Sequence, residues 1–183
     1  MKKSGCDEIS YGFESGTQRI LDYMKKGITI EQSKKAVEIT KKVGIDMHGF
    51  FIINFPNETK GEIVKTINFA KKMPLKWFRL SLATPYPGTE LYKICIKNNL
   101  VSKEQLKDWE KYNYLKEFYI YNPNISEKNL KNLLKKSNLI LFMKISYIKI
   151  TQKKFWNRII QGDFHTIIHS LKYIKNLLTI QRR

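Results

Sequence analysis

The chain has 183 residues, of which 42% are hydrophobic and 13% aromatic, so it is long and apolar enough for a folded core and is not a disordered protein. Its net charge of +18 favours an anionic partner such as nucleic acid, a membrane surface or a phosphorylated ligand. A lysine-rich composition can equally follow from AT-rich coding. The two cysteines form no disulfide framework, and the N-terminus lacks the apolar core of a signal peptide. We therefore expect a cytoplasmic protein without a transmembrane segment, either free or peripheral to the membrane.

Three runs of apolar residues predict β-strands, at Glu8–Phe13, Met47–Phe55 and Trp77–Ala83. The runs are nearly continuous instead of alternating between apolar and polar residues. Strands of this kind are typical of parallel sheets that are buried on both faces. The sequence therefore predicts an α/β fold with about three parallel strands.

Helices separate the strands, and two of them begin with a capping box. The first box is Thr29 to Gln32, and its helix is expected to end at Gly44. We predict that the buried face of this helix consists of Ala36, Ile39, Thr40 and Val43. The second box is Thr59 to Glu62. It opens a helix that ends before Pro74 and has Ile63, Ile67 and Ala70 facing inward.

Beyond the third strand the pattern is helical, at roughly 89–99, 103–112 and 126–138, followed by one or two basic helices. We place a domain boundary at Asn122, which divides the chain into a domain at 1–121 and a helical extension at 122–183. The extension has 13 basic and 2 acidic residues, against 21 and 14 in residues 1–121. His165 and His169 lie one helical turn apart, but no third ligand is visible, so we predict no metal site there.

Unusual residues follow each predicted strand: "GFESG" after the first, "NFPNET" after the second and "TPYPGTELY" after the third. Each stretch, taken alone, can be an ordinary turn or helix cap. Ligands of parallel α/β folds sit at the carboxyl ends of the strands, so together the three stretches predict a binding rim.

These three motifs, in this order, resemble the later half of the radical S-adenosylmethionine (radical SAM) enzymes over about residues 6 to 120. The most similar branch has members related to coproporphyrinogen oxidase, methylthiotransferases and cobalamin-associated enzymes. The resemblance implies the C-terminal half of a partial (βα)6 TIM-like barrel, followed by a helical C-terminal extension.

By the same resemblance, the chain binds the adenosyl part of S-adenosylmethionine. Glu14 and Ser15 match a polar pair that contacts the ribose, and the residues Ile52, Asn54, Phe55 and Pro56 match the strand end that borders the adenine. Thr84 and Pro85 match the exit of the last strand, where backbone groups approach the adenine. Tyr86 and Arg79 are further candidates to face the substrate, a small or lipid-like molecule that the sequence does not identify.

The family's 5′-deoxyadenosyl-radical chemistry starts at a [4Fe–4S] cluster held by a CxxxCxxC loop. This chain has only Cys6 and Cys95, whose spacing does not suit such a cluster. Asn54 and Asn57 also stand where the family usually has glycine. We therefore expect a truncated or split radical SAM enzyme that is inactive alone and is completed by its N-terminal half or by a partner chain.

A second class of function remains open on the sequence. In this alternative the chain is a non-catalytic binding or subunit protein, whose basic residues 122–183 dock on RNA, an anionic membrane or a partner chain.

Overall fold

The computed structural model describes residues 1–102 and 120–137. The chain divides into two compact units, Met1–Leu134 and Lys135–Arg183. The domain boundary predicted at residue 122 lies inside the first unit. Ile125 and Leu130, which follow this position, pack in a hydrophobic cluster with residues of the sheet and of the helix at residues 60–72.

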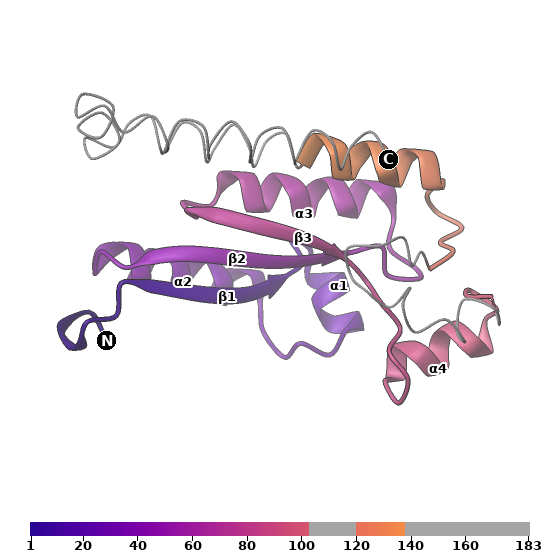
Figure 1. The fold of residues 1–183 in the computed structure, drawn as a ribbon, viewed down its shortest axis with the longest axis horizontal. Coiled ribbons are helices and arrows are strands. Elements are labelled where there is room, and N and C mark those ends of the chain that lie inside the picture. Colours follow the sequence, from indigo (N-terminus) through magenta and orange to yellow (C-terminus); the bar gives the residue numbers. More distant parts are fainter. Residues whose placement is uncertain (103–119, 138–183) are drawn as a thin grey trace, which may run out of the picture. The chain divides into compact units, whose positions relative to one another are not determined.

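Three parallel strands form one sheet in the order β1-β2-β3, with β1 at Glu8–Glu14, β2 at Asp46–Ile53 and β3 at Trp77–Leu82. The described helices are α1 (Gln18–Tyr23), α2 (Ile30–Lys42), α3 (Lys60–Lys72) and α4 (Glu90–Lys97), and a further helix covers residues 127–137. A short 3-10 helix, η1, precedes the sheet at Lys2–Ser4. The predicted α/β fold with three parallel strands is confirmed (Figure 1).

Both capping boxes are present. The Thr29 side chain accepts a hydrogen bond from the backbone of Gln32 at the start of α2, and Thr59 does the same with Glu62 at the start of α3. In each box the side chain of the third residue also bonds back to the N-cap backbone, so two otherwise free donors are satisfied. Local sequence therefore determines where these two helices begin.

Phenylalanine rings pack together in the core on one face of the sheet. The Phe51 ring lies 5.6 Å from that of Phe13 and 6.2 Å from that of Phe78, and α3 adds the Phe69 ring edge-on at 6.4 Å. Gly49 lies within this layer, where an added Cβ would approach the Leu75 side chain to 2.6 Å. Dense packing on this face therefore requires a glycine in β2.

The predicted buried face of α2 is wrong in part. Val37 and Thr40 are buried together with Ser33, whereas Ile39 and Val43 are 54% and 49% exposed. The Thr40 hydroxyl lies 2.6 Å from the Tyr11 hydroxyl of β1. This contact orients α2 on the sheet by a polar pair, which a search for apolar periodicity does not detect.

His48 lies in β2 and pairs with Trp77 of β3. Its side chain is buried and stacks on Trp77, with 4.5 Å between ring centroids and 21° between the planes. Within the described part of the chain, Nε2 has no hydrogen-bond partner and lies 3.8 Å from Glu8 Oε2. Aromatic stacking, not a hydrogen bond, is thus the main contact of this ring.

Candidate functional site

The carboxyl ends of β1, β2 and β3 lie at the same edge of the sheet, because all three strands are parallel and adjacent. The backbone N–H of Ala83 continues the pairing past β3 by donating to Ile53 O at 2.8 Å. We call this edge the rim and define it by three segments: Glu14–Ser15, Ile52–Thr59 and Thr84–Pro85. The structure thus brings all eight residues predicted to bind the cofactor to one edge.

Glu14 ends β1 in an unusual backbone conformation. Its φ is 62°, in the left-handed region that a residue with a long side chain rarely adopts, and the pairing register shifts between Gly12 and Glu14. Such a bulge re-aims the side chain that follows it. The carboxylate lies 3.0 Å from Lys26 Nζ, and its side chain keeps 15% exposure. Glu14 is therefore held as a partly exposed carboxylate at the rim.

Ser15 follows Glu14 and is fully buried. Its hydroxyl is 3.2 Å from the hydroxyls of both Thr17 and Thr66 and accepts a hydrogen bond from the Thr17 backbone. The next residue, Gly16, passes so close to α3 that an added Cβ would approach the Thr66 Cα to 2.8 Å. The Ser15 side chain therefore ties the end of β1 to α3.

Asn54 begins the turn between β2 and α3, residues 54–59, which we call the β2 turn. Its φ is 69°, and its side chain is fully buried. The carboxamide nitrogen donates to Ile120 O at 3.0 Å. Asn57, the other asparagine at a position where the family uses glycine, is exposed and does not adopt a positive φ. Only the first of the two positions thus needs the left-handed conformation, which asparagine tolerates better than most residues.

Glu58 closes the β2 turn from inside the protein. Its Oε2 accepts hydrogen bonds from the backbone N–H groups of Asn54 at 2.6 Å and Phe55 at 3.1 Å, and the side chain is fully buried. Burial raises the pKa of this carboxyl to about 7, against the opposing effect of the two N–H groups. Among the described residues, neither Glu58 Oε1 nor Asn54 Oδ1 has a hydrogen-bond partner.

Arg19 holds the outer side of the same turn. Its guanidinium binds both carboxylate oxygens of Glu62 at 2.6 Å and donates to Asn57 O at 2.9 Å. The guanidinium lowers the pKa of Glu62 to about 2. Two carboxyl groups four residues apart therefore have opposite pKa shifts, one caused by burial and the other by a bidentate ion pair.

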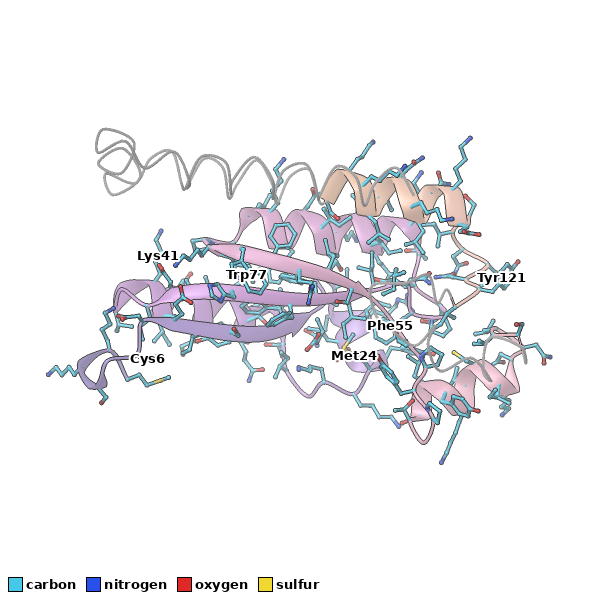
Figure 2. The ribbon with its side chains drawn as sticks, viewed as in Figure 1. Cys6, Met24, Lys41, Phe55, Trp77 and Tyr121 are labelled. Carbon is cyan, nitrogen blue, oxygen red and sulfur yellow. The ribbon has the colours of Figure 1, made fainter. Side chains whose placement is uncertain are left out.

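The apolar residues at the end of β2 differ in burial. Phe55 and Pro56 are buried, and Phe55 packs in a cluster with Ile20, Ala83, Cys95 and Ile120. The Tyr23 ring meets the Phe55 ring edge-on at 6.2 Å. Ile52 packs against this cluster but is only partly buried. Figure 2 shows Phe55 at this end of the sheet, beside Met24.

Thr84 and Pro85 follow β3. Pro85 is fully buried, whereas Thr84 is half-buried and its hydroxyl donates to Leu82 O at 3.2 Å. Tyr86, predicted to face the substrate, is 43% exposed, and Arg79 is also exposed. Of the eight predicted cofactor-binding residues, those with exposed surface at the rim are thus Glu14, Ile52 and Thr84.

Neither cysteine is placed to hold an iron–sulfur cluster. Cys6 precedes β1, at the opposite end of the strands from the rim (Figure 2). Cys95 lies buried in α4, where burial raises the pKa of its thiol to about 11. Residues 1–102 and 120–137 contain no group of three side chains suited to a metal ion. His165 and His169 lie outside the described residues.

Sequence reasoning did not single out four residues that hold the rim together: Arg19, Lys26, Glu58 and Asn122. Glu58 stands in the visible "NFPNET" motif, but nothing local shows that its carboxyl turns inward. The Lys26 and Arg19 contacts span 12 to 43 residues of sequence, and those of Asn122 reach back 64 residues or more. Such pairs follow from the tertiary fold.

Residues 1–70 match the model of the radical SAM superfamily. Residues 1–70 therefore belong to a radical SAM domain. The match covers β1, α1, α2, β2 and most of α3, together with the first two segments of the rim. The resemblance seen in the three motifs is thereby confirmed.

Curated relatives match a longer stretch. An uncharacterized methyltransferase of Pyrococcus horikoshii is 46% identical over 112 residues, which cover 61% of this chain and 24% of the relative. A bacteriochlorophyllide d C-8(2)-methyltransferase of Chlorobaculum tepidum is 32% identical, with coverage of 61% and 25%. A putative methylthiotransferase of Methanocaldococcus jannaschii is 33% identical, with coverage of 56% and 24%. The chain thus spans about a quarter of the length of these relatives.

The alternative function depends on the basic residues 122–183, of which 138–183 lie outside the described residues. None of the helices in the described part of the chain has the length and hydrophobicity to span a membrane. Docking of the basic extension on RNA, a membrane surface or a partner chain stays a prediction.

Proposed function

We propose that the rim binds the adenosyl part of S-adenosylmethionine, with Glu14 as the group that accepts hydrogen bonds from the ribose hydroxyls. The observation that carries this proposal is the conformation of Glu14. A non-glycine residue at positive φ costs on the order of 1 kcal/mol or more, and such strain is concentrated at functional sites. Glu14 has this conformation at the edge where parallel α/β folds bind ligands.

The chemistry of the partly exposed rim residues suits an adenosyl group. A carboxylate accepts hydrogen bonds from a vicinal diol that are stronger than bonds between neutral groups. Ile52 offers an apolar surface to the adenine ring from the middle strand, and Thr84 offers backbone groups from the last strand. In this proposal Ser15, Asn54, Phe55, Pro56 and Pro85 are positioning residues, because all five are buried.

We further propose that these 183 residues bind the nucleoside without cleaving it. In the family a reduced [4Fe–4S] cluster supplies the electron for cleavage. Cys6 and Cys95 do not fit such a cluster, since they are two thiols, one of them buried in α4 and the other at the far end of β1. A polypeptide that contributes the cluster would have to complete the reaction.

The ribose contact can be tested by calorimetry with S-adenosylhomocysteine and its 2′-deoxy analogue. We expect the wild-type chain to bind the ribose form about tenfold more tightly, and Glu14→Gln to lose most of this preference, since a hydrogen bond to a charged group is worth about 1.5–3 kcal/mol. Glu38→Gln, an exposed carboxylate on α2, is the matched control. Equal preference in wild type and Glu14→Gln would refute the assignment of Glu14 to the ribose.

The absence of cleavage can be tested by anaerobic cluster reconstitution of the chain. We expect far less than four irons per chain and no release of 5′-deoxyadenosine from S-adenosylmethionine under reducing conditions. Stoichiometric cluster iron together with 5′-deoxyadenosine release would overturn this part of the proposal.

A further inference from the structure

Residues 120–125 are far from the rim in the sequence but contact it in the structure. They contain Asn122-Pro123-Asn124, a sequence typical of a linker, yet Asn122 is 4% exposed and bonds to the β2 turn. Its carboxamide nitrogen donates to Phe55 O at 2.9 Å and to Glu58 O at 2.8 Å. Its Oδ1 accepts from the backbone N–H of Asn124 at 2.9 Å, which fixes the orientation of the carboxamide.

The contact is reciprocal. The Asn54 side chain donates from the β2 turn to Ile120 O at 3.0 Å, so each segment provides an asparagine whose amide bonds to a backbone carbonyl of the other. A carboxamide suits this task because it offers two N–H donors without a charge, whose burial would cost several kcal/mol.

Two hydrophobic clusters hold residues 120–125 on either side of Asn122. Ile120 packs in the cluster of Phe55, Ala83 and Cys95. Ile125 packs in a second cluster with Ile53, Ile63, Ile67 and Leu130. The segment is therefore packed into the core at Ile120 and at Ile125. Asn122 lies between these two residues and contacts the β2 turn.

Two other side chains also hold the β2 turn. Glu58, which belongs to the turn, accepts at Oε2 from the N–H groups of Asn54 and Phe55, and Arg19 of α1 donates to the carbonyl of Asn57. Asn122 donates to the carbonyls of Phe55 and Glu58. Backbone groups of this six-residue turn are thus bonded by the turn itself, by α1 and by Asn122, which lies beyond β3.

We propose that Asn122 is a positioning residue of the rim: by bonding to the Phe55 and Glu58 carbonyls, it holds the β2 turn in the conformation that receives the adenosyl group. The conformation of the rim then depends on a segment that follows β3 by almost 40 residues of sequence. The ligand part of this proposal rests on the proposed function above, whereas the effect on the turn does not.

Hydrogen exchange measured by NMR on the full 183-residue chain tests the effect on the turn. We expect Asn122→Ala to speed amide exchange at Asn54 and Phe55 at least tenfold, while amides in α2 change much less. Asn124→Ala is the matched control, because that side chain is exposed and only its backbone bonds to Asn122. Unchanged exchange at Asn54 and Phe55, or equal acceleration throughout the unit, would overturn the proposal.

A pH profile separates positioning from a general loss of packing. Asn122→Asp keeps the shape of the side chain but has no donor when ionised, and it regains one O–H donor when protonated. We expect Asn122→Asp to bind S-adenosylhomocysteine at least fivefold more weakly than wild type at pH 8 and to recover part of that loss near pH 5. Wild type and Asn122→Ala provide the baselines, because Glu58, Glu62 and Arg19 around the turn also carry charge.

The two proposals fail in different ways. If the wild-type chain does not bind S-adenosylhomocysteine, the proposed function is wrong, and the exchange rates alone decide whether Asn122 holds the turn. If wild type binds but Asn122→Asp shows the pH profile of Asn122→Ala, Asn122 does not position the rim through its donor. Should Asn122→Ala fail to fold, Asn122→Ser, which keeps one hydroxyl donor, takes its place in the exchange measurement.

Discussion

The end of β1 and the end of β2 each have one non-glycine residue at positive φ, Glu14 in the first and Asn54 in the second, but the two residues have different surroundings. Asn54 is fully buried and lies in a turn held by side chains from several elements. Glu14 keeps exposed surface, and its carboxylate is held by the ion pair with Lys26. The two ends thus differ: the β2 end is buried and held by hydrogen bonds, whereas the β1 end carries a partly exposed carboxylate in an ion pair.

The residue types agree with this division. Asparagine adopts the left-handed region at little cost, so Asn54 serves a structural turn. Glutamate adopts this region rarely, so Glu14 carries backbone strain at a partly exposed position. The following predictions test the two ends against each other.

Removal of the buried carboxylate should have the largest effect. Glu58→Ala leaves the N–H groups of Asn54 and Phe55 without their acceptor in a buried turn, so we expect a loss of about 2–4 kcal/mol in the free energy of unfolding. Glu58→Gln keeps an acceptor oxygen and should lose less. Urea denaturation measures both, with the exposed Glu38→Ala as a control expected within about 0.5 kcal/mol of wild type. A loss below 1 kcal/mol for Glu58→Ala would show that the turn does not depend on this carboxyl.

The pH dependence of stability should come from Glu58 at neutral pH. Its folded-state pKa of about 7 is above the unfolded value, so the folded chain binds the proton more tightly. The resulting stabilisation is fully present below about pH 4.5 and is lost as the pH rises through about 7, with an upper bound of roughly 3 kcal/mol. We expect the denaturation midpoint of wild type to decrease as the pH is raised from 5 to 8. The midpoint of Glu58→Gln should change little over the same range.

Glu62, in the first turn of α3, should give a pH dependence of stability with the opposite sign. Because Arg19 lowers its pKa to about 2, its stabilisation is present above about pH 4.5 and is lost as the pH falls toward 2. Arg19→Ala should therefore reduce stability at pH 7 and abolish this acid-side decline. A decline that persists unchanged in Arg19→Ala would assign it to other carboxyl groups.

The smallest changes in the free energy of unfolding should come from glycine substitutions at the two positive-φ residues, and these changes should have opposite signs. Glu14→Gly relieves the backbone conformation and should raise the free energy of unfolding by up to about 1 kcal/mol, while it weakens binding of S-adenosylhomocysteine. Asn54→Gly relieves little strain and loses the bond to Ile120 O, so it should lower stability by about 1 kcal/mol. Chemical denaturation and calorimetry on the same samples measure both quantities. A Glu14→Gly chain that is less stable than wild type would remove the contrast between the two strand ends.

Much of the fold was predictable from patterns within a few residues. The three strands, the two capping boxes and the meeting of the three motifs at one edge follow from apolar runs, capping residues and the geometry of parallel sheets. The failure on α2 has a local cause: Ile39 and Val43 have helical spacing, but the helix turns Val37 and Thr40 to the sheet, and Thr40 meets Tyr11.

The sequence by itself determined the family motifs, the three parallel strands and the position of the rim, because these depend on backbone propensity and on the spacing of apolar residues. Only the tertiary structure decided which rim residues are exposed and which are held inside. Glu58 looks like a surface helix-cap residue until the turn folds it inward, and Asn122 looks like a linker until two hydrophobic clusters fix it against that turn. Contacts across more than 60 residues of sequence depend on packing, which local patterns do not encode.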